Sequence, residues 1–460
     1  MWNDSLLGIR LVIIVCLVCL FATAVMAQPD IGQKFPVNGS VDTDPCGPFG
    51  FEFNNTSLDF SGVDFIDVFR VTGSLTGLRL QGEYTYDAGA KTLSFIPDIP
   101  FAPGETVSIT ATTELADENG TTLPHGITWH TYIVPKVDED TGLMPLRDPN
   151  ESPDWEVIYL PDNGSGLGFT VLDITYGDVN FDGDLEIVML NQAENGDFEM
   201  MVVEKNSSNI WNAKVPVSCG LDNPRQVRLA NLDNDRALEL CLLGMRDFVI
   251  WHAPSSTHSP DASLSGPGDR YPLNFNANAL DFGDFDGDGD NDLVVFSDYG
   301  FDYTIFINDG DAGFVQQAKV SNEANPGAKS LVGSPLKTSV GDLDGDGDLD
   351  LMWAAGSQEN GNFWVHVAQG NNSAGDATFL PSKRFAADAM QYPQLLIPFE
   401  TSENAQTPDG CQLMVARKKE VRKYDFDSDL DDDPGFIKLF GEDGLDRGGM
   451  EFSNLFSDGG

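Results

Sequence analysis

The sequence predicts an all-β protein in which a β-sandwich is followed by a β-propeller of four-stranded blades. An aspartate-rich motif recurs with first residues at 178, 231, 284 and 342, a spacing of 53, 53 and 58 residues. A fixed period of this size is typical of propellers and solenoids. Residues 33–135 instead carry short apolar runs with turn residues about every 8–12 positions, which is typical of a sandwich.

The N-terminus has the pattern of a secretory signal peptide over residues 1–27. Arg10 precedes the apolar run Leu11–Ala24, and Val25 and Ala27 offer small residues before a cleavage point. A retained membrane anchor is the alternative, but it needs roughly 20 apolar residues and this run is shorter. We therefore expect a secreted or cell-surface protein with no membrane insertion after cleavage at Ala27.

The overall charge restricts the partners. The chain has 26 basic and 73 acidic residues and a formal net charge of -47. Such a surface repels nucleic acid and anionic membranes and favours solubility and cation binding. Adaptation to salt would give the same excess of acidic residues.

The predicted sandwich, residues 33–135, contains apolar runs such as Leu93–Ile96 and Val107–Ala111 between Asp- and Gly-rich turns. It resembles a bacterial Ig-like domain of the SbsA type through the segments 84–97, 101–110, 116–123 and 129–133. The resemblance implies a spacer or adhesion module without catalysis. Residues 136–153, rich in Asp, Glu and Pro, are predicted to be a linker.

Residues 154–460 are predicted to form the propeller, because each period supplies four short strands. The expected strands of the third, fourth and fifth repeats are 279–283, 293–296, 303–307, 314–320; 338–340, 351–355, 363–367, 378–380; and 393–399, 412–416, 421–424, 435–440. The fifth repeat's loop, Glu400–Gly410, lacks ligand spacing, so no metal is expected there.

Both ends of this region suggest an incomplete blade. Residues 155–160 and 168–171 are predicted to be the third and fourth strands of a preceding blade, and 450–460 to begin another. Closure of one blade by both ends would give about six blades in all. The alternative, which we favour, is that further repeats are missing.

The repeated motif has the pattern of a calcium loop. From Asp342, acidic residues occupy positions 1, 3, 5, 7 and 9, and Gly347 is sixth. An oxygen-only shell needs carboxylates at positions 1, 3 and 5, a glycine at the turn, a carbonyl at 7 and a closing carboxylate. The flanking segments are short and apolar, which places the loop in a β-hairpin instead of between helices. A metal-free turn closed by aspartate side chains is the alternative, but crowded carboxylates would then repel one another.

With this motif and blade pattern, residues 154–460 resemble the FG-GAP family, also called VCBS repeats, known from integrin α-subunit heads and secreted bacterial proteins. The resemblance implies calcium in the hairpin between the first two strands of each blade. It implies side-chain or carbonyl ligands at Asp342, Asp344, Asp346, Asp348, Asp350; Asp284, Asp286, Asp288, Asp290, Asp292; Asp178, Asn180, Asp182, Asp184, Glu186; and Asn231, Asp233, Asp235, Glu239. Three loops are expected to bind Ca²⁺. In the second, Arg236 replaces the turn glycine and could itself take the place of the cation.

Four cysteines remain after the predicted cleavage, at 46, 219, 241 and 411. Export permits disulfides, and Cys219 and Cys241 lie in one repeat and are the favoured pair; unpaired buried thiols are the alternative. Tryptophans 211, 251, 353 and 364 could line a carbohydrate platform, but their strand positions favour packing between blades.

No catalytic motif stands out. None of the five histidines forms a HExxH motif, and Gly164–Gly168 lacks the strand and helix of a nucleophile elbow. We therefore expect no catalytic residues and no organic cofactor, and adhesion or recognition of an extracellular protein or glycan. The alternatives are a polysaccharide-processing lyase or hydrolase and a purely structural surface spacer.

Overall fold

The computed structural model describes residues 29–133 and 169–440, apart from 41–42, 55–57, 59, 61, 79–80, 103, 180–184, 206–210, 234, 236, 253–267, 298–301, 318, 321–334, 357–362, 372–376, 387–394, 400–411, 418–419 and 426–435. The predicted signal peptide and linker lie outside these ranges. Strands dominate, as predicted, with one short helix, α2 (Phe65–Val68). Within the described ranges, no helix has the length and apolarity needed to cross a membrane.

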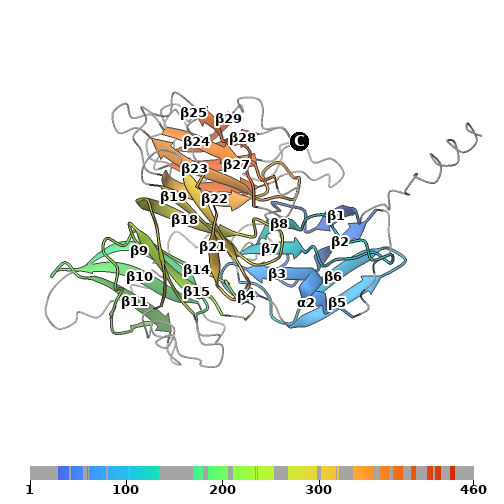
Figure 1. Ribbon diagram of the computed structural model, residues 1–460, viewed down its shortest axis with the longest axis horizontal. Helices are drawn as coiled ribbons and strands as arrows, with labels where there is room; N and C mark the ends of the chain where they lie inside the picture. The colour runs from blue at the N-terminus through green and yellow to red at the C-terminus, as the bar shows by residue number, and fades with distance from the viewer. Residues whose placement is uncertain are drawn as a thin grey trace, which may run out of the picture.

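Residues 29–133 form two antiparallel four-stranded sheets around one core (Figure 1). The first has the order β1-β2-β6-β5 and the second β4-β3-β7-β8. Their bounds are β1 (Ile31–Phe35), β2 (Phe49–Phe53), β3 (Phe69–Gly73), β4 (Gly77–Leu78), β5 (Gly82–Asp87), β6 (Thr92–Pro97), β7 (Thr106–Ala111) and β8 (Ile127–Tyr132).

The core of these two sheets is aromatic. Phe51 makes edge-to-face contacts with Phe69 and Trp129, and all three side chains are fully buried. Alternate residues of strands such as β6 point into this core, as the two-residue period of a strand requires. Two sheets with one shared core are what the sequence predicted; membership of the Ig-like class stays a prediction.

Five further sheets follow, each an up-and-down meander of four strands in blade order (Figure 1). The first also carries β13 (Val217–Ser218) on β11. Their strands are β9 (Phe169–Gly177), β10 (Glu186–Ala193), β11 (Phe198–Lys205), β12 (Trp211–Ala213); β14 (Gln226–Ala230), β15 (Glu239–Leu243), β16 (Asp247–Trp251), β17 (Asp269–Pro272); β18 (Ala277–Gly283), β19 (Asp292–Ser297), β20 (Tyr303–Asn308), β21 (Phe314–Gln316); β22 (Pro335–Gly341), β23 (Asp350–Gly356), β24 (Phe363–Ala368), β25 (Lys383–Ala386); and β26 (Leu395–Phe399), β27 (Gln412–Arg417), β28 (Glu420–Asp425), β29 (Phe436–Phe440).

The innermost strands of successive sheets lie against one another in the order β9, β14, β18, β22 and β26. The second strands are buried on both faces, so their sequences are apolar throughout, as in β15, Glu-Leu-Cys-Leu-Leu. Trp353 and Trp251 are buried in the cores between sheets. Packing, as predicted, is the role of these two tryptophans.

The favoured Cys219–Cys241 disulfide is wrong: both thiols are free and buried. Cys219 lies in the core that the second sheet shares with the first. Cys241 points from the other face of β15 into the core shared with the third sheet. The backbone of β15 therefore separates the two sulfur atoms. Cys46 is free and exposed, and Cys411 lies outside the described residues.

Two strand assignments also differ from the prediction. Residues 169–171 open the long first strand β9, where Phe169 pairs with Ala193, and do not end a preceding blade. The fourth strand of the fourth sheet is β25, whereas Phe379 of the expected strand forms only an isolated bridge to Gly370. Segments 155–160 and 450–460, proposed for a sixth blade, lie outside the described residues.

Candidate metal-binding loops

Each predicted loop joins the first two strands of a sheet. The closing carboxylate is always paired across the hairpin with the residue before the loop, as in Gly283–Asp292 and Gly341–Asp350. Gly177–Glu186 and Ala230–Glu239 repeat this register. The hairpin placement expected from the sequence is therefore observed in four consecutive sheets.

The closing carboxylate has a structural role common to all four loops. One of its oxygens accepts the backbone N–H of the loop's second residue, at 2.8 Å for Phe285 to Asp292 and 2.6 Å for Leu343 to Asp350. Glu186 and Glu239 accept the equivalent bonds at 3.0 and 2.7 Å. In the third and fourth loops the other oxygen accepts a second backbone N–H, from Asn308 and Gly370. These bonds fix the last oxygen donor before any ion binds.

The third and fourth loops have the same internal geometry. The two oxygens of Asp284 accept the N–H groups of Gly287 and Gly289 at 2.8 and 3.1 Å. Asp342 does the same with Gly345 and Gly347, again at 2.8 and 3.1 Å. Gly289 and Gly347, at the sixth position, have φ values of +95° and +98°, which side chains rarely adopt. The turn glycine was predicted; the left-handed glycine at position four was not.

These turns bring part of each predicted ligand set together. Carboxylate oxygens of Asp284, Asp286 and Asp292 lie within 4.8 Å of one another, and so do those of Asp342, Asp344 and Asp350. Positions 1, 3 and 9 therefore converge. Asp288 and Asp346, at position 5, lie outside these tight groups, and Asp290 pairs with Arg70.

A cluster made only of oxygen atoms has the chemistry of a calcium site, because Ca²⁺ takes six to eight oxygen ligands in a flexible shell. In the first loop, Asp178 and Glu186 are described, whereas Asn180, Asp182 and Asp184 lie outside the described residues.

The electrostatics of the clusters favour a cation. Burial, followed by repulsion from Asp288, raises the pKa of Asp284 to about 7. Burial also raises the pKa of Asp342 to about 7, although Lys34 opposes the shift. Burial and neighbouring carboxylates raise the pKa values of Asp286 and Asp346 to about 8. A bound divalent cation would remove this repulsion and let all the carboxyls ionise.

These shifts predict how the calcium-free protein responds to pH. The carboxyls ionise near 3.8 when unfolded but only near 7 to 8 when folded, so the folded state holds extra protons between these values. Its free energy of unfolding should therefore fall as pH rises from 5 to 8. Urea denaturation in EGTA at several pH values measures this. Saturating calcium should abolish the slope, and a calcium-free stability that rises over this range would contradict the shifts.

The second loop is built differently. The Asn231 amide donates to the carbonyls of Asp235 and Ala237, both at 2.8 Å. Ala237 is at position seven, where a calcium loop uses the carbonyl as a ligand. Asp233 and Glu239 approach His252 instead of Asp235. Arg236 lies outside the described residues.

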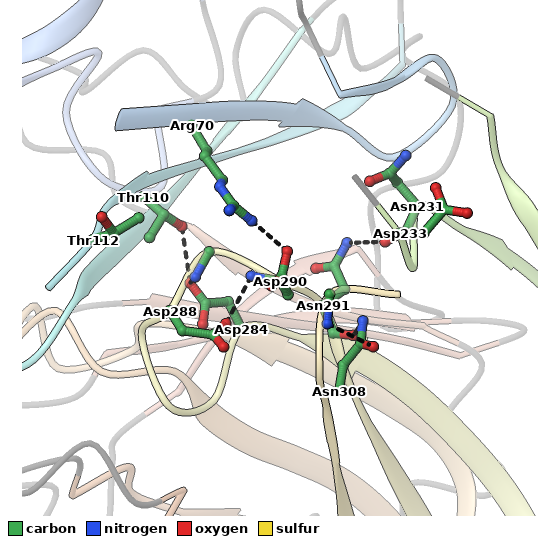
Figure 2. Close-up of polar contacts among 12 residues, drawn as sticks. Arg70, Thr110, Thr112, Asn231, Asp233, Asp284, Asp288, Asp290, Asn291 and Asn308 are labelled. Atoms are coloured by element: carbon green, nitrogen blue, oxygen red, sulfur yellow. Dashed lines mark hydrogen bonds and ion pairs between the residues drawn. The ribbon is translucent and has the colours of Figure 1, made fainter. Parts of the chain in front are cut away.

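The sandwich lies directly on the third loop, a contact that the sequence did not predict (Figure 2). The hydroxyls of Thr110 on β7 and Thr128 on β8 both donate to Oδ2 of Asp284, at 3.1 and 3.0 Å. Arg70 forms an ion pair with Asp290. A side chain on Gly287 would collide with the backbone of Gly126, so the two chains touch at their glycines.

The first and fourth loops contact the sandwich as well. The Thr128 N–H donates to the Gly347 carbonyl at 3.0 Å, and the Asn38 amide donates to the Asp342 carbonyl at 2.9 Å. Lys34 Nζ lies 3.8 Å from Asp342 Oδ2. In the first loop, the Asp178 N–H donates to the carbonyl of Leu75 at 2.8 Å. The sandwich thus spans the loops of three sheets.

The sandwich–loop contact escaped sequence reasoning because the residues responsible belong to ordinary strands. Thr110 and Thr128 lie on neighbouring strands, where threonine is common. Only their convergence on a carboxylate more than 150 positions away reveals their role.

Comparison with known proteins identifies part of the chain. Residues 284–353 match the model of the FG-GAP-like repeat family. None of the curated proteins matches the sequence as a relative.

Similar solved structures include the periplasmic gluconolactonase of Pseudomonas aeruginosa, with 10% identity and a TM-score of 0.39 over 82% of this chain and 99% of that one. An auxiliary nutrient binding protein of Bacteroides thetaiotaomicron has 9% identity and a TM-score of 0.36, covering 90% of this chain and 86% of that one. The β-propeller domain of Vanderwaltozyma polyspora Nup133 has 13% identity and a TM-score of 0.26, covering 59% and 90%.

The family match begins at the first ligand of the third loop and ends in β23, after the fourth loop. The two loops in which oxygen donors converge are therefore the ones that the family model recognises. Residues 284–353 are an FG-GAP-like repeat segment.

Proposed function

We propose that this protein is a secreted or cell-surface, calcium-stabilised β-propeller that recognises an extracellular protein or glycan. The observation that carries the proposal is the convergence of three carboxylates at the same position of consecutive sheets, in the segment that matches FG-GAP-like repeats. Calcium would bind these oxygens and, through them, tie the first two strands of each sheet together. The ion would be structural, because each carboxylate set closes on its own hairpin.

The contact with the sandwich determines which end of the propeller is free for a ligand. The loops between first and second strands lie under the sandwich in three sheets. The opposite end carries the turns between second and third strands, such as Gly244–Arg246 of the second sheet. We assign ligand recognition to this opposite end and to the connections around it, with catalysis absent.

Binding to an array of glycans and extracellular proteins, with calcium and with EGTA, tests this function. We expect binding that chelation weakens and that Arg246→Ala, at the opposite end, reduces. A reducing-end assay on acidic polysaccharides should remain negative. Release of reducing ends would instead make the protein a polysaccharide-processing enzyme. Absence of binding across the array would make it a structural spacer.

A further inference from the structure

The second loop contains a mixed cluster with a histidine. Carboxylate oxygens of Asp233 and Glu239 and a ring nitrogen of His252 lie within 4.8 Å of one another. Asp233 is held by a backbone bridge to Asp311 of the next sheet, and Glu239 is the first residue of β15. His252 follows directly on the end of β16. Three adjacent segments of the fold therefore bring these side chains together.

An unsatisfied oxygen points to a ligand at this cluster. Oε2 of Glu239 accepts the Leu232 N–H, but Oε1 has no hydrogen-bond partner, and the side chain is 0% exposed. At the same position, both oxygens of Asp292 and of Asp350 accept a backbone N–H. Leaving a buried carboxylate oxygen without a partner is costly unless a cation or donor occupies the space beside it.

The blade geometry explains why a histidine reaches this loop. Leu240 pairs with Trp251 in the second sheet, as Leu351 pairs with Ala368 in the fourth. His252 is therefore the counterpart of Gln369, whose amide donates to Asp344 Oδ2 at 2.7 Å. Asp344 and Asp233 occupy the same third position of their loops. The fold thus directs this side chain at the position-three carboxylate in both sheets.

The donor set does not suit calcium. The Asn231 amide occupies the carbonyl of Ala237, which a calcium shell would use at position seven. In its place a histidine nitrogen joins the two carboxylates, and imidazole is a ligand for zinc and related transition metals. His252 Nε2 lies 3.1 Å from Asp269 Oδ2. Such a carboxylate commonly orients a metal-binding imidazole from outside the first coordination shell.

We propose that the second loop binds a zinc-class divalent metal ion through Asp233, Glu239 and His252, while the neighbouring loops take calcium. Three protein ligands leave a fourth position for water. The Zn²⁺ would neutralise the two carboxylates and give the free oxygen of Glu239 its partner. The proposal depends on the second loop alone and does not require that the other loops bind calcium.

Titration of the chelator-treated full chain with Zn²⁺ in excess calcium tests this site. We expect one tightly bound Zn²⁺ per chain, with an affinity that falls at least 10-fold in His252→Ala. The matched control is His125→Ala in the sandwich, a partly exposed histidine outside the cluster, which should leave the affinity unchanged. Circular dichroism checks that each variant is folded, and His252→Gln replaces His252→Ala if the latter is not.

Co²⁺ provides a second measurement, because its visible absorption reports nitrogen and oxygen coordination directly. The spectrum should appear at one Co²⁺ per chain and disappear in the folded His252 variant but not in His125→Ala. Equal zinc affinity in the wild type and the His252 variant would overturn the proposal. Displacement of the zinc by calcium at similar concentrations would overturn it too.

Discussion

Removal of calcium from the full chain will lower its melting temperature by about 10 °C or more. Extracellular oxygen-only modules bind calcium with Kd values of roughly 10⁻⁴–10⁻³ M. At 10 mM calcium, each occupied loop then stabilises the folded state by about 1.4–2.7 kcal/mol through mass action. Three loops together contribute about 4–8 kcal/mol, and each kcal/mol shifts the transition of a domain this large by about 2 °C or more. Thermal melts with 10 mM calcium and with EGTA measure the difference.

Single-site variants assign this stabilisation to the loops. Asp286→Ala and Asp344→Ala each remove one carboxylate from a converged set, so each should reduce the calcium-dependent shift by about one third. In EGTA the same variants should be as stable as the wild type or more stable, because one repelling carboxylate is gone. Asp87→Ala, at an exposed turn of the sandwich, is the matched control and should leave the shift intact. A full shift in both loop variants would show that calcium acts elsewhere.

Loss of two threonine hydroxyls will weaken calcium binding in the third loop, although neither residue belongs to the propeller. Thr110 and Thr128 both donate to Oδ2 of Asp284, the first ligand of that loop. A hydrogen bond to a charged group contributes about 1.5–3 kcal/mol, so Thr110→Val with Thr128→Val should reduce the affinity about 10-fold or more. Calorimetric titration with calcium measures this loss. Thr85→Val, at an exposed position of β5, is the matched control.

The same contact makes calcium a determinant of domain docking. Coupling between two equilibria is reciprocal, so calcium in the third and fourth loops must strengthen docking by the factor by which docking strengthens calcium binding. Amide hydrogen exchange on β7 and β8 should therefore accelerate in EGTA, and more so in the double valine variant. Arg70→Glu, which places a negative charge beside Asp290, should have the same effect. Exchange on these strands that ignores calcium would separate the two events.

The sequence predicted the fold well because the determining signals are local. The aspartate period marked the hairpins, and a closing carboxylate lies opposite the residue before the loop in all four sheets. Apolar segments such as 293–296 and 351–355 became strands buried on both faces. Residues 169–171 were misassigned because an apolar strand preceding a repeat has the same composition whether it ends one blade or begins the next.

What the sequence could not predict depends on contacts between distant segments. No local pattern shows that Thr110 and Thr128 meet Asp284, or that Arg70 meets Asp290. His252 could have been found only by aligning it with Gln369, the residue that follows the third strand of another sheet. The Cys219–Cys241 pairing failed because neighbouring positions in one repeat can face opposite cores.

The most direct test of the calcium assignment is a count of calcium ions bound to the purified chain. Metal analysis after equilibrium dialysis at millimolar calcium should find three ions per chain, in the first, third and fourth loops. Asp284→Ala and Asp342→Ala should each remove one, and together two. A wild-type chain that binds no calcium would contradict the account, and the acidic loops would then be metal-free turns.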